Sequence, residues 1–122
     1  MTHPLQAPIE ELWERRAELS PQSSVATITA IESVIADVDA GKLRVAEKIA
    51  GEWLTHQWIK KAVLLSFRVR DNRIQQAGDI RFYDKVDTKF EAWTEEQFRQ
   101  GGFRVVPGTI VRKGSFVAKN AV

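Results

Sequence analysis

Arg104 is the side chain of this sequence whose type and surroundings best suit the binding of a substrate. It stands in the run Gly102-Phe-Arg-Val-Val-Pro107, which predicts a strand over residues 103–106 that the proline ends. Because side chains alternate across a strand, Arg104 must face the other way from Phe103 and Val105, so if these two point into the core, we expect Arg104 to project from the opposite face. A guanidinium held on a rigid strand beside two glycines can bind a carboxylate in a two-pronged way. From composition alone, a solvated arginine at a sheet edge is the favoured interpretation.

The two histidines are the next candidates for chemistry. His3 and His56 are too few and too far apart in the sequence to predict a metal site, and we expect His3 in a frayed terminus. His56 lies at a strand-to-helix junction, where an imidazole can hydrogen-bond exposed amides; a ligand or acid/base role is the alternative. The patterns GxxxxGK[ST], GxGxxG, GxSxG and HExxH do not occur. We therefore assign no catalytic residue and no metal ligand in this chain.

Aromatic and basic residues leave a nucleic-acid interface open as an alternative. Four tryptophans could stack on bases, but three of them sit in apolar patterns, which favours core packing: Trp13, Trp53, Trp58 and Trp93. Lysines and arginines cluster loosely between residues 60 and 73, a pattern typical of a solvated helix face. The net charge is only +2, from 18 basic and 16 acidic residues, so we expect no nucleic-acid partner.

Length and composition predict one folded domain. The 122 residues are 43% hydrophobic and 28% charged, the balance of a globular protein. The absence of cysteine excludes disulfides and thiolate metal sites and indicates the cytoplasm. The first eleven residues do not resemble a targeting signal, and no apolar stretch reaches spanning length, so we expect neither secretion nor membrane insertion.

Two helices are predicted to position the first half of the chain. The first covers residues 8–19 and ends at a proline- and serine-rich turn over residues 20–24. The second covers residues 25–40, with Ile28, Ile31, Ile35 and Val38 on one stripe and Gly41 at its C-cap. These helices can pack as a hairpin.

The remaining elements are short and mixed. Residues 43–47 and 53–55 predict a β-hairpin, residues 57–70 a central amphipathic helix, and residues 80–86 a strand. Thr94 and Gln97 form a capping box for a short helix that Gly101 and Gly102 terminate. Helices and strands are segregated rather than alternating, which predicts an α+β fold: a helical hairpin plus small mixed β-structure.

The carboxyl end follows a different pattern. Ile110, Phe116 and Val122 are spaced six apart, with Gly114 and Ala118 between them, as in a hexapeptide β-helix. Three positions at this spacing are too few to establish a β-helix by themselves. The pattern predicts an α+β domain over residues 1–107 and the first hexapeptide repeats over residues 108–122.

Longer runs of the sequence resemble one enzyme family over nearly the whole chain and in the same order. They are Glu14-Arg-Arg-Ala-Glu18, Leu43-Arg-Val-Ala-Glu-Lys followed by Trp53, Thr55-His-Gln-Trp58, Lys60-Lys-Ala-Val-Leu-Leu-Ser-Phe-Arg68, Tyr83-Asp-Lys-Val86 and Gly102-Phe-Arg-Val-Val-Pro107. Together they closely resemble the amino-terminal domain of tetrahydrodipicolinate N-succinyltransferases.

The resemblance implies a function that the residues alone do not. Members of this family transfer succinyl from succinyl-CoA, a co-substrate, to a cyclic dicarboxylate acceptor in diaminopimelate and lysine synthesis, and no permanent cofactor is expected. They are homotrimers that carry a left-handed parallel β-helix after the amino-terminal domain. Arg104 matches a substrate-binding arginine that would pair with an acceptor carboxylate, whereas the acid/base residues and most of the CoA groove would lie beyond Val122. We therefore expect a fragment that is inactive alone; the alternative is a non-catalytic binding or oligomerisation module.

Overall fold

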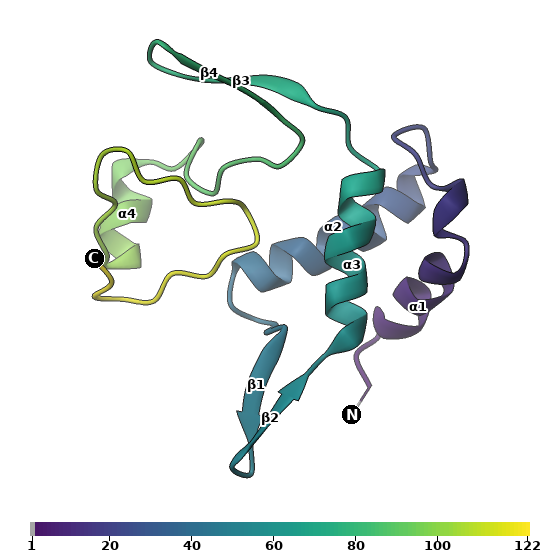
Figure 1. The fold of residues 1–122 in the computed structure, drawn as a ribbon. Coiled ribbons are helices and arrows are strands. Elements are labelled where there is room, and N and C mark those ends of the chain that lie inside the picture. Colours follow the sequence, from purple (N-terminus) through teal and green to yellow (C-terminus); the bar gives the residue numbers. More distant parts are fainter. Residues whose placement is uncertain (1) are drawn as a thin grey trace.

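Three helices from the first half of the chain form the hydrophobic core (Figure 1). The computed structural model describes residues 2–122. Helix α3 (Gln57–Arg68) packs against both α1 (Gln6–Glu14) and α2 (Val25–Asp39). The buried apolar side chains come from all three helices and the segments beside them: Ile9, Leu12, Leu19, Ile31, Val34, Trp58, Ile59, Ala62, Leu65 and Val69. The α+β class is confirmed, but α1 and α2 pack mainly on α3 rather than as a hairpin on each other.

Local sequence explains where the first helices begin and end. The predicted helix over residues 8–19 is divided into α1 and a 3-10 turn at Arg16–Glu18. Helix α2 begins where the Ser24 hydroxyl accepts a hydrogen bond from the Thr27 amide at 3.2 Å. It ends before Gly41, whose φ of 77° confirms the predicted left-handed glycine.

Helix α3 uses two different faces. Trp58, Ile59, Ala62 and Leu65 are buried in the core, and full burial of a side chain such as Leu65 contributes about 1.5–3 kcal/mol. The adjacent face, which includes Phe67, lines a pocket instead of the core. The predicted central position of this helix is confirmed, because α3 packs against both α1 and α2.

Two antiparallel hairpins extend from the helices as separate two-stranded sheets (Figure 1). Strands β1 (Ala46–Ile49) and β2 (Glu52–Thr55) are joined by Ala50 and Gly51, both with positive φ, as a two-residue type I′ hairpin turn requires. The predicted hairpin is confirmed, although its first strand begins three residues later than expected.

Strands β3 (Arg73–Ala77) and β4 (Ile80–Asp84) make the second hairpin, with Ala77 opposite Ile80 and Arg73 opposite Asp84. The strand predicted over residues 80–86 corresponds to β4, and β3 was not predicted.

The last third of the chain folds back beside α2. Helix α4 (Glu95–Gly101) has the predicted capping box between Thr94 and Gln97, and the chain then follows an irregular path that ends beside α4 (Figure 1). An isolated bridge joins Thr88 to Arg112. The strand predicted over residues 103–106 is wrong, because a single backbone bond from Arg104 to Ala121 does not make a ladder.

Residues 108–122 contain no β-helix coil in this chain. Within residues 2–122, none of the helices is both long and apolar enough to cross a membrane.

Candidate functional site

The segment that carries Arg104 keeps the predicted alternation although it is not a strand. Phe103 and Val105 are half-buried, whereas Arg104 and Val106 are exposed. The Arg104 amide donates to the Ala121 carbonyl at 3.1 Å, and the Asn120 amide donates to the Gly102 carbonyl at 2.7 Å. The backbone at Arg104 is therefore tied to the turn over residues 118–121.

Aromatic packing supports the same segment from the other side. The Phe103 ring lies 5.5 Å from that of Phe90 and 5.8 Å from that of Trp93, and both of these contact Phe98. A Cβ atom on Gly101 would lie 2.7 Å from the Phe103 ring, so this close approach requires glycine. Apolar contacts thus fix the position of the backbone from which Arg104 projects.

The Arg104 side chain has no hydrogen-bond or ion-pair partner within residues 2–122. Its guanidinium is exposed and carries a full positive charge with five N–H donors in one plane. A carboxylate from outside the chain could accept two parallel hydrogen bonds without displacing an internal partner.

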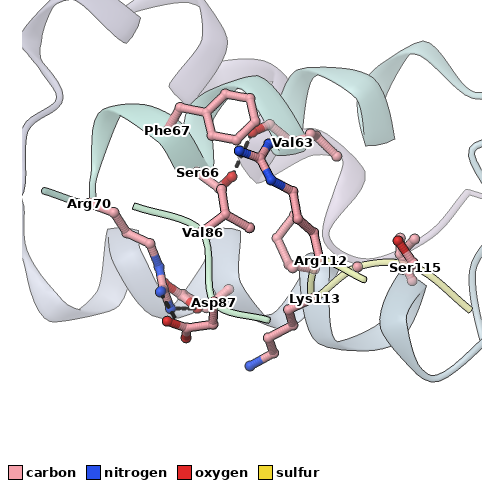
Figure 2. A pocket seen from close by; sticks show the side chains of 13 residues that line it. Val63, Ser66, Phe67, Arg70, Val86, Asp87, Arg112, Lys113 and Ser115 are labelled. Carbon is pink, nitrogen blue, oxygen red and sulfur yellow. Dashed lines mark hydrogen bonds and ion pairs between the residues drawn. The ribbon is translucent and has the colours of Figure 1, made fainter. Parts of the chain in front are cut away.

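A pocket of about 220 Å³ lies elsewhere, between α2, α3 and the segments around residues 86–87 and 112–115 (Figure 2). Apolar side chains such as Ile35, Val63, Phe67 and Val86 form much of its wall. Arg104 is not among the lining residues, so the structure does not bring the predicted binding residue into this pocket.

Arg70 lines the pocket and forms ion pairs with two carboxylates, one of which, Asp87, lies beside it in Figure 2. Its Nε and Nη2 atoms each donate to Glu32 of α2 at 2.8 Å, and Nη1 donates to Asp87 at 3.1 Å. Arg73 also donates to Asp87. Four charged side chains therefore link the segment after α3, helix α2, strand β3 and the segment after β4.

The pKa values follow from these contacts. Hydrogen bonding to Glu32 is the largest cause that raises the pKa of Arg70, and it outweighs the opposing effect of burial. Burial raises the pKa of Asp87, but the hydrogen bonds and the positive charges of Arg73 and Arg70 together outweigh it and hold that pKa below its ordinary value. Arg70 and Asp87 are thus charged and mutually satisfied, which indicates a structural role.

Lys89 and Asp39 make a second internal link that the sequence did not reveal. The Lys89 ammonium, whose side chain is 5% exposed, donates to the Asp39 carbonyl at 2.8 Å and lies 3.0 Å from Asp39 Oδ1. The Gly114 amide donates to the same Oδ1 at 2.8 Å. These bonds attach the carboxyl-terminal segment to the end of α2, and no local sequence motif marks them.

Three of the five basic residues between positions 60 and 73 form ion pairs: Lys61, Arg70 and Arg73. Lys61 pairs with Glu10, and Arg73 pairs with Asp87 and Glu91. The interpretation of a merely solvated helix face was incomplete, because these cations join separate elements. Such pairing leaves less free positive charge for a nucleic acid.

His56 and Trp53 lie in surroundings that differ from those predicted. His56 precedes α3, but its side chain does not cap the helix, so the predicted bond to exposed amides is wrong; its Nε2 lies 3.7 Å from Glu47 Oε1 instead. Trp58 is buried and Trp53 is 72% exposed, so Trp53 does not belong to the core. In the part of the chain that the structure describes, no group of three or more His, Asp or Glu side chains could hold a metal ion.

Comparison with known proteins gives the family. A family model described as the amino-terminal domain of tetrahydrodipicolinate N-succinyltransferase matches residues 4–69, more than half of the chain. The chain belongs to this family. The resemblance seen in the sequence is thereby confirmed.

Curated relatives of the family match almost the whole chain. A 2,3,4,5-tetrahydropyridine-2,6-dicarboxylate N-succinyltransferase of Dechloromonas aromatica is 88% identical over 122 residues, which are 100% of this chain and 45% of the relative. Proteins of the same name from Laribacter hongkongensis and Chromobacterium violaceum are 61% and 56% identical, over 94% and 98% of the chain and 42% and 44% of their own lengths. The chain thus spans a little under half the length of these succinyltransferases.

Proposed function

We propose that this chain is the amino-terminal part of an acyltransferase that moves succinyl from succinyl-CoA to tetrahydrodipicolinate in diaminopimelate and lysine biosynthesis. The proposal rests on one observation: the whole chain matches less than half of the length of a protein named as a succinyltransferase. The part played by these residues is to bind an acceptor carboxylate and to support assembly. Acid/base chemistry is assigned to the portion of the enzyme that this chain does not match.

Arg104 is the residue to which we assign acceptor binding. Its backbone is fixed by the turn over residues 118–121, while its guanidinium has no partner within the described residues. An acceptor with two carboxylates needs a cation that is not already neutralised, and the planar fork of an arginine orients such a group through charge-assisted hydrogen bonds. Holding the acceptor in this way would present to the thioester the amino nitrogen that derives from its cyclic imine.

We assign the finer features of the family to the complete enzyme. It would be a cytoplasmic homotrimer, with succinyl-CoA as co-substrate and no permanent cofactor. Ile110, Phe116 and Val122, all exposed here, would become the first apolar edge of a left-handed β-helix once further coils cover them. A coil without a neighbour cannot bury such an edge, which is consistent with the irregular path seen here.

The test is Arg104→Lys in the full-length enzyme. The KM for the acceptor should rise about tenfold, because an ammonium cannot reproduce two parallel hydrogen bonds and the loss of one charge-assisted bond is on the order of 1.4 kcal/mol. The KM for succinyl-CoA and the thermal unfolding should not change. Arg99→Lys is the matched control, since Arg99 is an exposed arginine on nearby α4 that pairs with Glu95. Unchanged acceptor kinetics in Arg104→Lys would remove the assigned role.

A binding or oligomerisation module without catalysis is the second candidate. It is favoured by the exposed aromatic side chains on both hairpins, with Trp53 and Tyr83 each 72% exposed. Light scattering of the 122-residue chain separates the two candidates, because a self-sufficient module should assemble without the remainder of the enzyme. A monomer that acquires trimeric assembly and turnover only at full length supports the enzyme.

A further inference from the structure

A second pocket, of about 450 Å³, lies at the start of α3, and both histidines of the chain line it. His3 comes from the amino-terminal segment and His56 from the residue before α3, so the fold joins two groups that are remote in sequence. Lys42, Arg44 and Glu47 line the same pocket. Arg104 does not, and neither does Arg70.

The charges in this pocket are mainly positive and mainly unpaired. Lys42 and Arg44 are exposed, and their side chains have no hydrogen-bond or ion-pair partner within residues 2–122. Glu47 is the acidic residue in the lining, and its carboxylate lies 3.7 Å from His56 Nε2. Two full positive charges therefore face a single carboxylate that already has a neighbour.

The arrangement of His3 adds a hydrogen-bond donor. Its Nδ1 accepts a hydrogen bond from the Leu5 amide at 3.1 Å, and its ring stacks on Trp58 with centroids 5.2 Å apart. Because Nδ1 accepts this bond, Nε2 is the ring nitrogen that can donate a hydrogen bond. The pocket thus combines cationic groups and N–H donors, whereas its acceptor capacity is limited to Glu47 and a few neutral groups.

We propose that this pocket binds a phosphate-bearing small molecule at a site separate from Arg104. A phosphate or diphosphate carries the two or more negative charges that Lys42 and Arg44 would neutralise, and its oxygens accept hydrogen bonds in many directions, as two flexible side chains require. The pocket volume leaves room for an organic group beside the phosphate. The amino terminus of α3, which has no acidic residue in its first turn, adds a favourable field but would not make a site by itself.

The phosphate could belong to a free metabolite or to the nucleotide part of a CoA thioester, and the experiment distinguishes these sources. Pyrophosphate and CoA are titrated separately into the 122-residue chain at constant ionic strength, and binding is followed by calorimetry. Dependence of both titrations on the same side chains assigns the site to CoA. Binding of pyrophosphate without CoA assigns it to a free phosphate compound.

Substitutions that remove a positive charge and a substitution that removes a negative charge should change the binding affinity in opposite directions. Lys42→Ala and Arg44→Ala should each weaken pyrophosphate binding about fivefold or more, since each removes a charge-assisted contact. Glu47→Gln should tighten binding about twofold, because it removes the opposing charge. Lys60→Ala is the control, since Lys60 is exposed on α3 but does not line the pocket, and it should leave the affinity unchanged.

Thermal unfolding of each variant should match that of the parent chain, since Lys42, Arg44 and Lys60 are exposed and half-buried Glu47 makes no side-chain hydrogen bond within residues 2–122. The proposal is overturned if pyrophosphate does not bind at roughly 10 mM. It is equally overturned if Lys60→Ala weakens binding as much as Lys42→Ala, because the attraction would then come from overall charge. Neither result bears on Arg104, so failure here is distinct from failure of the acyltransferase proposal.

Discussion

Replacement of Arg70 by methionine tests whether one cation holds the second half of the chain onto the helical core. Arg70 makes two hydrogen bonds to Glu32 at 2.8 Å and one to Asp87 at 3.1 Å. Hydrogen bonds to charged groups contribute about 1.5–3 kcal/mol when well shielded. Here the side chains of Arg70, Glu32 and Asp87 are 30%, 26% and 21% exposed, so water screens them in part. We expect Arg70→Met to lower the free energy of unfolding by about 2 kcal/mol, less than the 3–5 of a fully buried pair.

A double-mutant cycle isolates the bidentate pair from other consequences of the substitution. Urea unfolding is followed by circular dichroism for Arg70→Met, Glu32→Gln and the double variant, and the coupling energy should be about 1 kcal/mol. The control cycle uses Arg99 and Glu95, an i,i+4 pair on α4 whose side chains are 72% and 80% exposed. Its coupling should be below about 0.5 kcal/mol.

Two results would refute this reasoning. One is an unfolding midpoint of Arg70→Met equal to that of the parent, which would show that the carboxylates are as stable in water as beside the guanidinium. The other is equal coupling in the two cycles, which would show that two parallel bonds and partial burial add nothing to an exposed pair.

Two further predictions concern the same attachment of the second half of the chain. Gly41→Ala should lower the free energy of unfolding by about 2 kcal/mol, since Gly41 has positive φ and a Cβ would lie 2.8 Å from the Phe116 ring; Gly78→Ala, with positive φ but nothing within 4 Å, should cost about 1 kcal/mol. Equal losses on urea unfolding would contradict the contact. The lowered pKa of Asp87 predicts stability that is present above about pH 4 and lost as pH falls through the folded-state value. Urea midpoints at neutral and acidic pH should therefore differ less in Asp87→Asn than in the parent.

The helices could be predicted from the sequence because their signals are local. The apolar stripe of α2, its Gly41 terminus and the Thr94 capping box depend on residues within a few positions of one another. What could not be predicted is which helices pack together. Trp58 and Leu65 form part of the α3 face that contacts the core, while Val63 and Phe67 of the same helix line the pocket.

The errors in the β-structure have a physical cause. Strand β3 has the sequence Arg73-Ile-Gln-Gln-Ala77, in which only Ile74 has a strong β-preference, so its order depends on pairing with β4. Residues 103–106 have strong β-preference, yet they have no strand to pair with. The β-preference of a segment therefore decides little by itself. A strand also needs a second segment to hydrogen-bond with, and the rest of the fold determines whether that segment is present.

Predictions about the candidate site also depended on whether the relevant contacts were local in sequence or formed only by tertiary packing. The resemblance singled out Arg104, and the alternation around it held even without a strand. The partners of Arg70 could not be foreseen, because Glu32 and Asp87 are 38 and 17 residues away and many other acids were available. His56 was misjudged for a related reason, since its neighbour Glu47 is brought close by the β1–β2 hairpin.

Arg70 and Arg104 show why one arginine of a fold can be assigned to a ligand and another cannot. A carboxylate approaching Arg70 would have to displace Glu32 or Asp87, which would leave an acid without its partner and loosen the contact between α2 and α3. A carboxylate approaching Arg104 displaces only water, and the backbone beneath it is already held by Ala121. Binding at Arg104 therefore leaves the fold unchanged, which is the property that a reusable substrate contact requires.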